Sequence, residues 1–455
     1  MRVRIDWRVC SIVAALIGLC AGTAVAQDSN YWSSAYGTRA LLLGGVVTGS
    51  PGDISSVYYN PGAFALARNA ELLLAGSAYQ YQRVSVDGGS GPGRSLVSSV
   101  IAAVPSLFAG EIPVLKTDRL AYSFLGRQEV NLELDSRYTG STPVLPPMTN
   151  QVFAATELGF KQNVSENWFG ITWAHKLSPH LGIGASPYVA VRSQNTHASV
   201  FGETGDASNN LAVMNVSRDF DYLHWRALAK LGLSGVHDSL TYGVALTTPG
   251  AALFGGGQIR SNTTLVDQSG AVGNVAGANY QEDLKANYHS PLQVGAGASY
   301  GWRATRVHLA AEWNAEVPRY DVLHGSSYTV RTPLGDSTLT PVVEEKLDAV
   351  FNYGIGIEQR FRPTLIGYAS FHTDNSGRDN SDPANASVTS WDLKHISGGV
   401  TWHVMRSDFT FGASTAFASQ PVPPLPQTPA GTAAPPNLQS HVMMVTLLAG
   451  WKISF

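Results

Sequence analysis

Two basic residues four positions apart are the part of this sequence that best fits anion binding. Arg226 and Lys230 lie in the segment LHWRALAKLGL, residues 223–233, where apolar and polar residues alternate. Such alternation is typical of a β-strand, in which positions i and i+4 share one face. We expect that one carboxylate could contact both side chains, or else that each cation pairs with a carboxylate of the protein itself.

Other charged residues occupy the same polar face of similar alternating segments. Because both signs are represented and buried charges need partners, we expect most of them to form ion pairs within an interior. The set comprises Arg127, Glu129, Glu133, Arg192, His224, Glu312, Glu316, Glu358 and Arg360.

Apolar side chains occur where long polar connections are expected. Phe201 and Met214 lie in the connection 193–221, and Leu253 and Phe254 lie in the connection 250–283. Exposed apolar patches often bind ligands. These four residues are therefore candidates for hydrophobic capture, the alternative being a loop cluster that packs on itself.

Catalytic and cofactor motifs are weakly represented. His372 and Ser376 in HTDNSGR could serve an acyl hydrolase, but no orienting acid is evident. No phosphate loop, metal-ligand cluster or nucleic-acid motif appears, and the net charge of −3 indicates no nucleic-acid partner. We expect no enzyme activity, no metal and no cofactor.

The first 26 residues have the layout of a cleaved secretory signal. Three arginines precede an apolar run at residues 9–21, and a small-x-small site ends at Ala26. Both cysteines lie inside this segment. We therefore expect a mature chain without thiols, divided into an N-terminal segment, 27–68, and a larger domain, 69–455.

The larger domain has the composition and periodicity of a transmembrane β-barrel. Charged residues make up 14% of the chain, against about 25% in soluble domains. The chain ends in a strand pattern with one wholly apolar face, Met443 to Ile453 in steps of two. Lipid on that face explains both features. The alternative is a secreted soluble β-sandwich or propeller.

The connections favour the membrane barrel. From residue 168 onward, tight turns such as SPHLG alternate with long polar connections at 193–221, 250–283, 321–346, 375–391 and 419–439. Strands are also expected at 71–86, 96–108 and 119–134, and the residues 135–167 hold either an extra strand or a loop. The sequence thus predicts an all-β, antiparallel barrel of about fourteen strands.

The N-terminal segment does not alternate. It is rich in small residues, and it contains the breaker Asn60-Pro61-Gly62 after Tyr58 and Tyr59. A barrel of this width would otherwise enclose an aqueous hole. We expect residues 27–68 to form a plug in its lumen.

The segment 37–67 resembles the N-terminal hatch of the FadL/TodX-type outer-membrane transporters of long-chain fatty acids and hydrocarbons. That family's hatch carries Asn-Pro-Ala, so Gly62 departs at the third position. Segments such as ENWFGITWAHKLSPHLGIGAS, residues 166–186, and YHSPLQVGAGASY, residues 288–300, resemble later strands of the family. The resemblance implies a plugged fourteen-stranded barrel whose extracellular loops capture ligand in a hydrophobic groove.

The family also has a kink in its third strand that opens a lateral exit. Gly126 and Gln128 interrupt the apolar stripe of the expected third strand, and glycine within a strand often marks a bulge. The resemblance therefore implies a lateral-opening kink at Gly126, Arg127 and Gln128.

The function that these features favour is uptake of hydrophobic small molecules across the outer membrane of a Gram-negative bacterium. The expected partners are such a substrate and outer-membrane lipids or lipopolysaccharide, around a monomeric barrel. Three alternatives stay open: a docking or secretion-associated barrel whose proline-rich last connection binds a partner, an acyl hydrolase, and a general porin.

Overall fold

The computed structural model describes residues 29–50, 53–67, 71–88, 95–113, 118–140, 151–270, 273–378, 390–422 and 438–454. The predicted signal and most of the proline-rich last connection lie outside the described residues. Within them, no helix is both long and apolar enough to cross a membrane.

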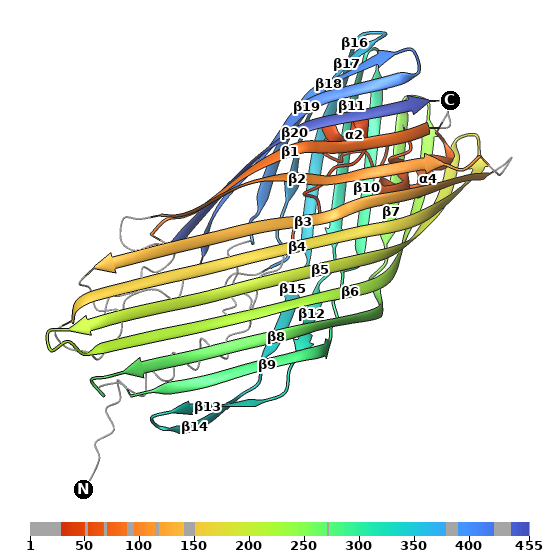
Figure 1. Cartoon of the computed structure of the whole chain (residues 1–455). Helices are drawn as coiled ribbons and strands as arrows, with labels where there is room; N and C mark the ends of the chain where they lie inside the picture. The colour runs from red at the N-terminus through yellow and green to blue at the C-terminus, as the bar shows by residue number, and fades with distance from the viewer. Residues whose placement is uncertain are drawn as a thin grey trace.

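Fourteen antiparallel strands close into a barrel, as predicted (Figure 1). Closure is made by pairing of the first strand with the last, from Glu71 opposite Ser454 to Val86 opposite Ser440. In order around the barrel the strands are β1 (Glu71–Val86), β2 (Leu96–Glu111), β3 (Asp118–Gly140), β4 (Gln151–Ser178), β5 (Leu181–Asp206), β6 (Leu211–His237), β7 (Leu240–Thr247), β10 (Gln293–Trp302), β11 (Thr305–Asn314), β16 (Val350–Arg362), β17 (Leu365–Asp374), β18 (Leu393–Val404), β19 (Ser407–Val422) and β20 (Leu438–Ser454).

The outer face of the barrel is apolar where the sequence predicts it. On β20, Met443, Val445, Leu447 and Trp451 are all exposed, while Leu448 between them is buried. On β16, Phe351, Tyr353, Ile355 and Ile357 alternate with buried or half-buried residues. A face of this composition is suited to hydrocarbon, because it leaves no charge in contact with the bilayer core.

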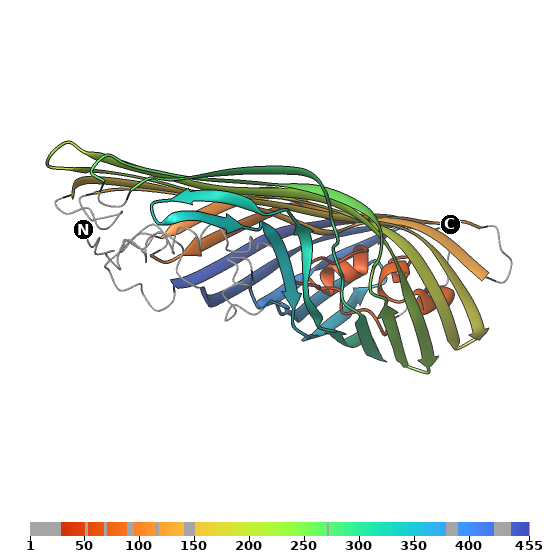
Figure 2. The same cartoon turned by 90° about the horizontal axis from the view of Figure 1, so that it is seen from below.

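Six further strands extend the molecule beyond one end of the barrel (Figures 1 and 2). β8 pairs with the far part of β6 and continues the sheet to β9, and the remaining four form two short hairpin-like pairs. Their bounds are β8 (Ala251–Asp267), β9 (Val275–Lys285), β12 (Val317–His324), β13 (Tyr328–Thr332), β14 (Gly335–Leu339) and β15 (Val342–Leu347).

Three of the predicted long connections are therefore largely strand. Residues 193–221 are the ends of β5 and β6 joined by a turn, residues 250–283 are mainly β8 and β9, and residues 321–346 include β12 to β15. The alternation of the barrel continues through the first of them: Val200, Met214 and Val216 are buried against an inner apolar cluster. Polar residues on both faces, such as Asn195 outside and Gln194 inside, concealed this continuity in the sequence.

In the described part of the uncertain region, residues 135–140 and 151–167, all residues belong to β3 or β4 and none to an additional strand. β3 reaches Gly140, and β4, which is 28 residues long, includes residues 152–162 in full. The structure also corrects the predicted facing of β3. Glu129 and Glu133 are exposed on the outer face, whereas Gln128 and Leu132 are buried. The reversal arises at an extra residue in the strand, Arg127.

The N-terminal segment lies inside the barrel (Figure 2). It contains three short helices, α2 (Thr38–Leu42), α3 (Ser56–Tyr59) and α4 (Pro61–Ala65). α2 contacts β17 to β20, while α4 contacts β3 to β7. The segment therefore bridges opposite parts of the wall, and its apolar residues form the main buried cluster together with inward wall residues such as Leu125 and Trp168.

Candidate functional site: a cationic cavity in the lumen

The Asn60-Pro61-Gly62 turn fastens the N-terminal segment to the wall. Asn60 caps α4 by accepting from the Gly62 N–H at 3.0 Å, and its Nδ2 donates to the carbonyl oxygens of Thr48 and Leu233, each at 3.0 Å. A Cβ atom on Gly62 would lie 2.6 Å from the carbonyl oxygen of Gly232 and 2.7 Å from that of Gly182. The alanine that the FadL/TodX-type hatch carries at this position would therefore clash here, because the backbone at Gly62 contacts the backbones of β5 and β6 directly.

An aromatic cluster surrounds this turn. Tyr36 packs edge-on against Tyr58, with ring centroids 4.6 Å apart, and Tyr58 also contacts Tyr59 and Trp168. Trp168 contacts Tyr188, whose hydroxyl donates to the Val57 carbonyl at 2.9 Å. Of the two tyrosines predicted as part of the motif, Tyr58 packs against β4 through Trp168, whereas Tyr59 contacts Tyr36 and Tyr58 within the segment.

A buried network of two arginines and one carboxylate lies next to this cluster. Arg226 Nη2 donates to Glu166 Oε1 at 2.5 Å, and Arg192 Nη1 donates to Glu166 Oε2 at 3.2 Å. Both guanidinium groups lie over the ring of Tyr288, at 4.2 Å for Arg192 and 4.7 Å for Arg226. Two cations share one carboxylate, so the network carries a net positive charge.

The network opens onto a cavity of about 40 Å³. Arg226, Glu166, Trp168 and Tyr288 contribute to its lining, as do Arg127 and Gln128 of β3. Since one water needs roughly 10–15 Å³ of such space, the cavity has room for a small polar headgroup such as a carboxylate and not for a hydrocarbon chain.

Several N–H groups of this network have no hydrogen-bond partner among the described residues. They are Nε and Nη1 of Arg226 and Nη2 of Arg192, and both side chains are almost wholly buried. A buried cationic donor without an acceptor is costly. An anion in the cavity would supply an acceptor for Arg226, which lines it.

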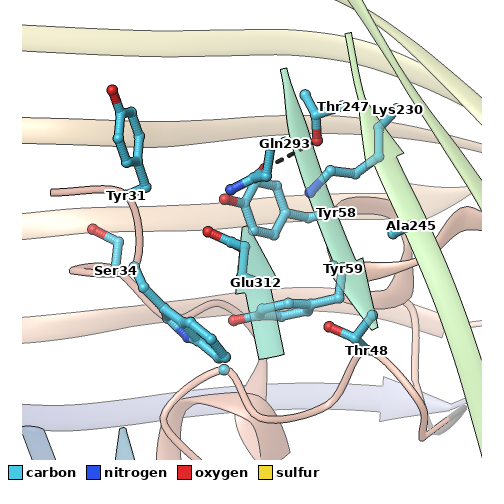
Figure 3. A pocket seen from close by; sticks show the side chains of 13 residues that line it. Tyr31, Ser34, Thr48, Tyr58, Tyr59, Lys230, Ala245, Thr247, Gln293 and Glu312 are labelled. Carbon is cyan, nitrogen blue, oxygen red and sulfur yellow. Dashed lines mark hydrogen bonds between the residues drawn. The ribbon is translucent and has the colours of Figure 1, made fainter. Parts of the chain in front are cut away.

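Lys230 faces a different cavity, shown in Figure 3. Its Nζ lies 4.2 Å from the ring centroid of Tyr58, and Glu312 lines the same space of about 20 Å³. Thr247 and Gln293 line both this cavity and the cationic one. The Thr247 hydroxyl donates to the Gln293 side chain at 3.0 Å, and this hydrogen bond lies between the two cavities. Arg226 and Lys230 thus share the inner face, as predicted, but they do not converge on one carboxylate.

The four candidate capture residues are not brought together. Met214 is buried in the inner apolar cluster of the extended strands, whereas Phe201 points outward on β5. Leu253 and Phe254 are exposed at the start of β8, where Phe254 stacks on Trp225 with ring centroids 5.3 Å apart. Their role in capture stays a prediction.

The β3 residues Gly126 to Gln128 lie at an irregularity of the wall. Gly126 pairs with Asn167 and Gln128 with Glu166, so Arg127 is an extra residue on β3. In the described residues the ladder between β2 and β3 also ends here, with Leu107 opposite Leu125. The extra residue brings Leu125 and Gln128 to the same inner face and directs the Arg127 and Gln128 side chains toward the cationic cavity.

His372 and Ser376 each contact a residue of the N-terminal segment. His372 Nε2 lies 3.2 Å from the Trp32 carbonyl, and its ring stacks on His395, while the Ser376 hydroxyl contacts that of Ser29. Nearby Asp374 accepts hydrogen bonds from the backbone N–H groups of Tyr31 and Trp32. Within the described residues these groups hold the start of the N-terminal segment against β17.

A second buried ion pair lies close enough to the arginine network for its carboxylate to interact electrostatically with Arg192 and Arg226. Glu345 of β15 lies 3.6 Å from Arg378, with both side chains fully buried, and accepts from the Tyr320 hydroxyl at 2.6 Å. Burial raises the pKa of the Glu345 carboxyl, and the positive charge of Arg378 opposes this rise. Tyr288 and Tyr320 belong to one apolar cluster, which joins this pair to the arginine network.

Sequence reasoning missed Glu166 and Tyr288, which complete the site. Glu166 lies in the region whose strand could not be placed, and Tyr288 lies between β9 and β10, outside any periodic segment. The sequence contained one signal for Glu166: it lies two positions before Trp168, so the two side chains share one face of a strand. In the structure the Trp168 indole N–H donates to Glu166 Oε1 at 2.7 Å.

The fold matches those of a solved FadL homologue and of two solved toluene transporters. A FadL homologue from Pseudomonas aeruginosa gives a TM-score of 0.58 at 11% identity, covering 94% of this chain and 100% of that chain. The toluene transporter TodX of Pseudomonas putida gives 0.59 at 12% identity, with 93% and 99% covered. The Ralstonia pickettii toluene transporter TbuX gives 0.53 at 13% identity, with 92% and 98% covered.

These likenesses confirm the predicted resemblance at the level of the fold. No protein-family model matches the sequence, and no curated protein matches it significantly.

Proposed function

We propose that this protein takes up hydrophobic molecules with an acidic headgroup across the outer membrane of a Gram-negative bacterium. The observation that carries the proposal is the headgroup-sized cavity in the lumen, which is lined by Arg226, a cation with buried N–H groups that have no acceptor among the described residues. A carboxylate there would accept two charge-assisted hydrogen bonds.

The N-terminal segment acts in this proposal as the hatch, defined here as residues 29–50 and 53–67. It fills the lumen beside the cavity and is held by Asn60 on one side and by Asp374 on the other. Water and ions are thereby kept from a straight aqueous path, which distinguishes this barrel from a general porin.

The route begins at the apolar surfaces of the extended strands. The inner cluster that includes Met214 gives the hydrocarbon chain a surface to follow. Phe201, Leu253 and Phe254 are exposed on the outside, and we assign them to first capture. The headgroup then reaches Arg226, with its tail extending back along the apolar wall.

The ligand leaves sideways at Gly126 to Gln128. Arg127 and Gln128 line the cavity and also lie where the β2–β3 ladder ends, so the cavity and this edge share residues. Release into the outer leaflet would avoid moving the hatch out of the barrel, which the extensive hatch–wall contacts would make costly.

The test compares a long-chain fatty acid with the fatty alcohol of the same chain length, by titration of the purified barrel in detergent. Arg226→Gln should weaken acid binding roughly 10- to 100-fold, because a hydrogen bond to a charged group is worth about 1.5–3 kcal/mol, and should leave alcohol binding unchanged. Arg260→Gln is the matched control, since Arg260 lies over Tyr280 on the outer face of β8.

Two outcomes would count against the proposal. Equal binding of acid and alcohol by both variants would make the arginines structural and favour a neutral hydrocarbon. Binding of neither ligand would favour the docking alternative.

A further inference from the structure

Tyr36 connects the hatch to the irregular part of β3. Its hydroxyl donates to the Gly126 carbonyl oxygen at 2.7 Å, and the Arg127 carbonyl oxygen lies 3.4 Å away. Its backbone N–H donates to the Tyr59 hydroxyl at 2.7 Å. The side chain is fully buried, so water does not substitute for these bonds.

The acceptor of this bond lies at a special place in the wall. Gly126 is the last β3 residue before the extra Arg127, and β2 pairs with β3 only up to Leu125 in the described residues. A carbonyl at such a point has lost the regular ladder. The hatch supplies the partner that a neighbouring strand supplies elsewhere.

A second bond runs in the opposite direction between the same two segments. Arg127 Nη2 donates to the Tyr31 carbonyl at 2.5 Å. At its other end the hatch is fixed through Tyr59, which directly precedes Asn60 and its bond to the Leu233 carbonyl of β6. A continuous connection thus runs from β6 through the hatch to the edge of β3.

We propose that Tyr36 is a positioning residue that holds the hatch closed against the β3 edge, so that ligand leaves only when its hydroxyl releases Gly126. The inference rests on the proposed lateral route. It assigns the coupling between the hatch and the exit to one side chain. Loss of the Tyr36 hydroxyl should leave headgroup binding at Arg226 unaffected, because Tyr36 does not line that cavity.

The test is hydrogen exchange of the purified barrel in lipid nanodiscs, read over residues 121–130. Tyr36→Phe keeps the ring and removes the hydroxyl, and exchange there should rise roughly tenfold or more, because a buried carbonyl is left unpaired. The matched control is Tyr188→Phe, since Tyr188 is also buried and its hydroxyl also bonds the hatch, at the Val57 carbonyl, but from β5.

A second readout separates positioning from general loosening. Preloaded labelled fatty acid should leave the Tyr36→Phe barrel for the bilayer several times faster than it leaves wild type, whereas its equilibrium affinity stays within about twofold. The Tyr188→Phe barrel should match wild type in both.

Unchanged exchange at 121–130, an equal rise in Tyr188→Phe, or an unchanged release rate would each overturn the inference. If no variant binds fatty acid at all, the proposed function fails, and the exchange difference alone then decides whether Tyr36 holds the hatch to β3.

Discussion

At the scale of single residues, Gly62 is a position with no room for a side chain. The Cβ of an alanine would meet carbonyl oxygens of two wall strands at 2.6 and 2.7 Å. We predict that Gly62→Ala lowers the stability of the folded barrel by about 1–3 kcal/mol through overpacking, measured as the urea midpoint in lipid vesicles.

The control is Gly256→Ala, because the nearest atom to a Cβ there is 3.9 Å away. Equal stability of the two variants would show that α4 is free to move off β5 and β6, and would remove the explanation given for glycine at this position.

For Arg226 and Lys230, prediction from the sequence succeeded for facing and failed for pairing. The inner position of Arg226 and Lys230 follows from alternation alone, because each strand position has only two faces. Their partners come from other strands and from the hatch: Glu166 for Arg226 and the ring of Tyr58 for Lys230. Contacts of this kind depend on register around a closed barrel, which a period-two pattern does not contain.

At the scale of elements, β3 shows how one residue changes a strand. Before Arg127 the odd-numbered residues Ala121, Ser123 and Leu125 are buried, and after it the buried residues include Gln128, Leu132 and Leu134. The two halves of the strand are therefore out of phase in the sequence itself. Assuming one phase throughout placed Glu129 and Glu133 on the wrong face.

The phase change makes a clean deletion possible. Removing Arg127 places Gln128 directly after Gly126, and their partners Glu166 and Asn167 are already adjacent on β4. The regular pairing and all side-chain facings are thereby kept. We predict that this deletion folds but transports labelled fatty acid into cells at less than about a tenth of the wild-type rate, since the irregular edge is gone.

Arg127→Gln is the comparison, because it removes the charge and keeps the extra residue. It should retain transport with weaker binding. Normal uptake by the deletion variant would show that ligand does not leave at this edge.

The lengths of β5 and β6 also differ from the prediction. Residues 193–221 were predicted as a connection because many of them are polar, yet buried apolar residues such as Val200, Met214 and Val216 continue the inner face. A strand beyond the bilayer has water on its outer face, so it loses the apolar stripe but keeps the alternation. Alternation is therefore the better guide to strand length, and the apolar stripe is the better guide to membrane depth.

At the scale of the whole molecule, the apolar outer face predicts a depth-dependent cost of charge. Leu447 is 55% exposed near the middle of the β20 stripe, and His441 lies at its end beside Asp87. We predict that Leu447→Lys costs about 2–4 kcal/mol of unfolding free energy in vesicles and that His441→Lys costs about 0–1 kcal/mol. Equal costs would mean that this face does not meet hydrocarbon.

The architecture itself was predictable because it repeats. Many segments show the same alternation of apolar and polar residues, so a wrong assignment of any one segment leaves the predicted architecture unchanged. The cationic cavity arises once, from several strands, a residue between strands and the non-periodic hatch. The sequence predicted inward positions for its arginines but not the contributions of Glu166 and Tyr288.

The most direct test of headgroup binding at Arg226 is mass spectrometry of small molecules extracted from the barrel purified from cells, compared with Arg226→Gln prepared in parallel. We expect fatty acids or related hydrophobic acids in the wild-type extract and a severalfold lower content in the variant, with neutral lipids equal in both. Equal amounts of acid in the two extracts, or a wild-type extract that contains only neutral hydrocarbon, would contradict the proposed function.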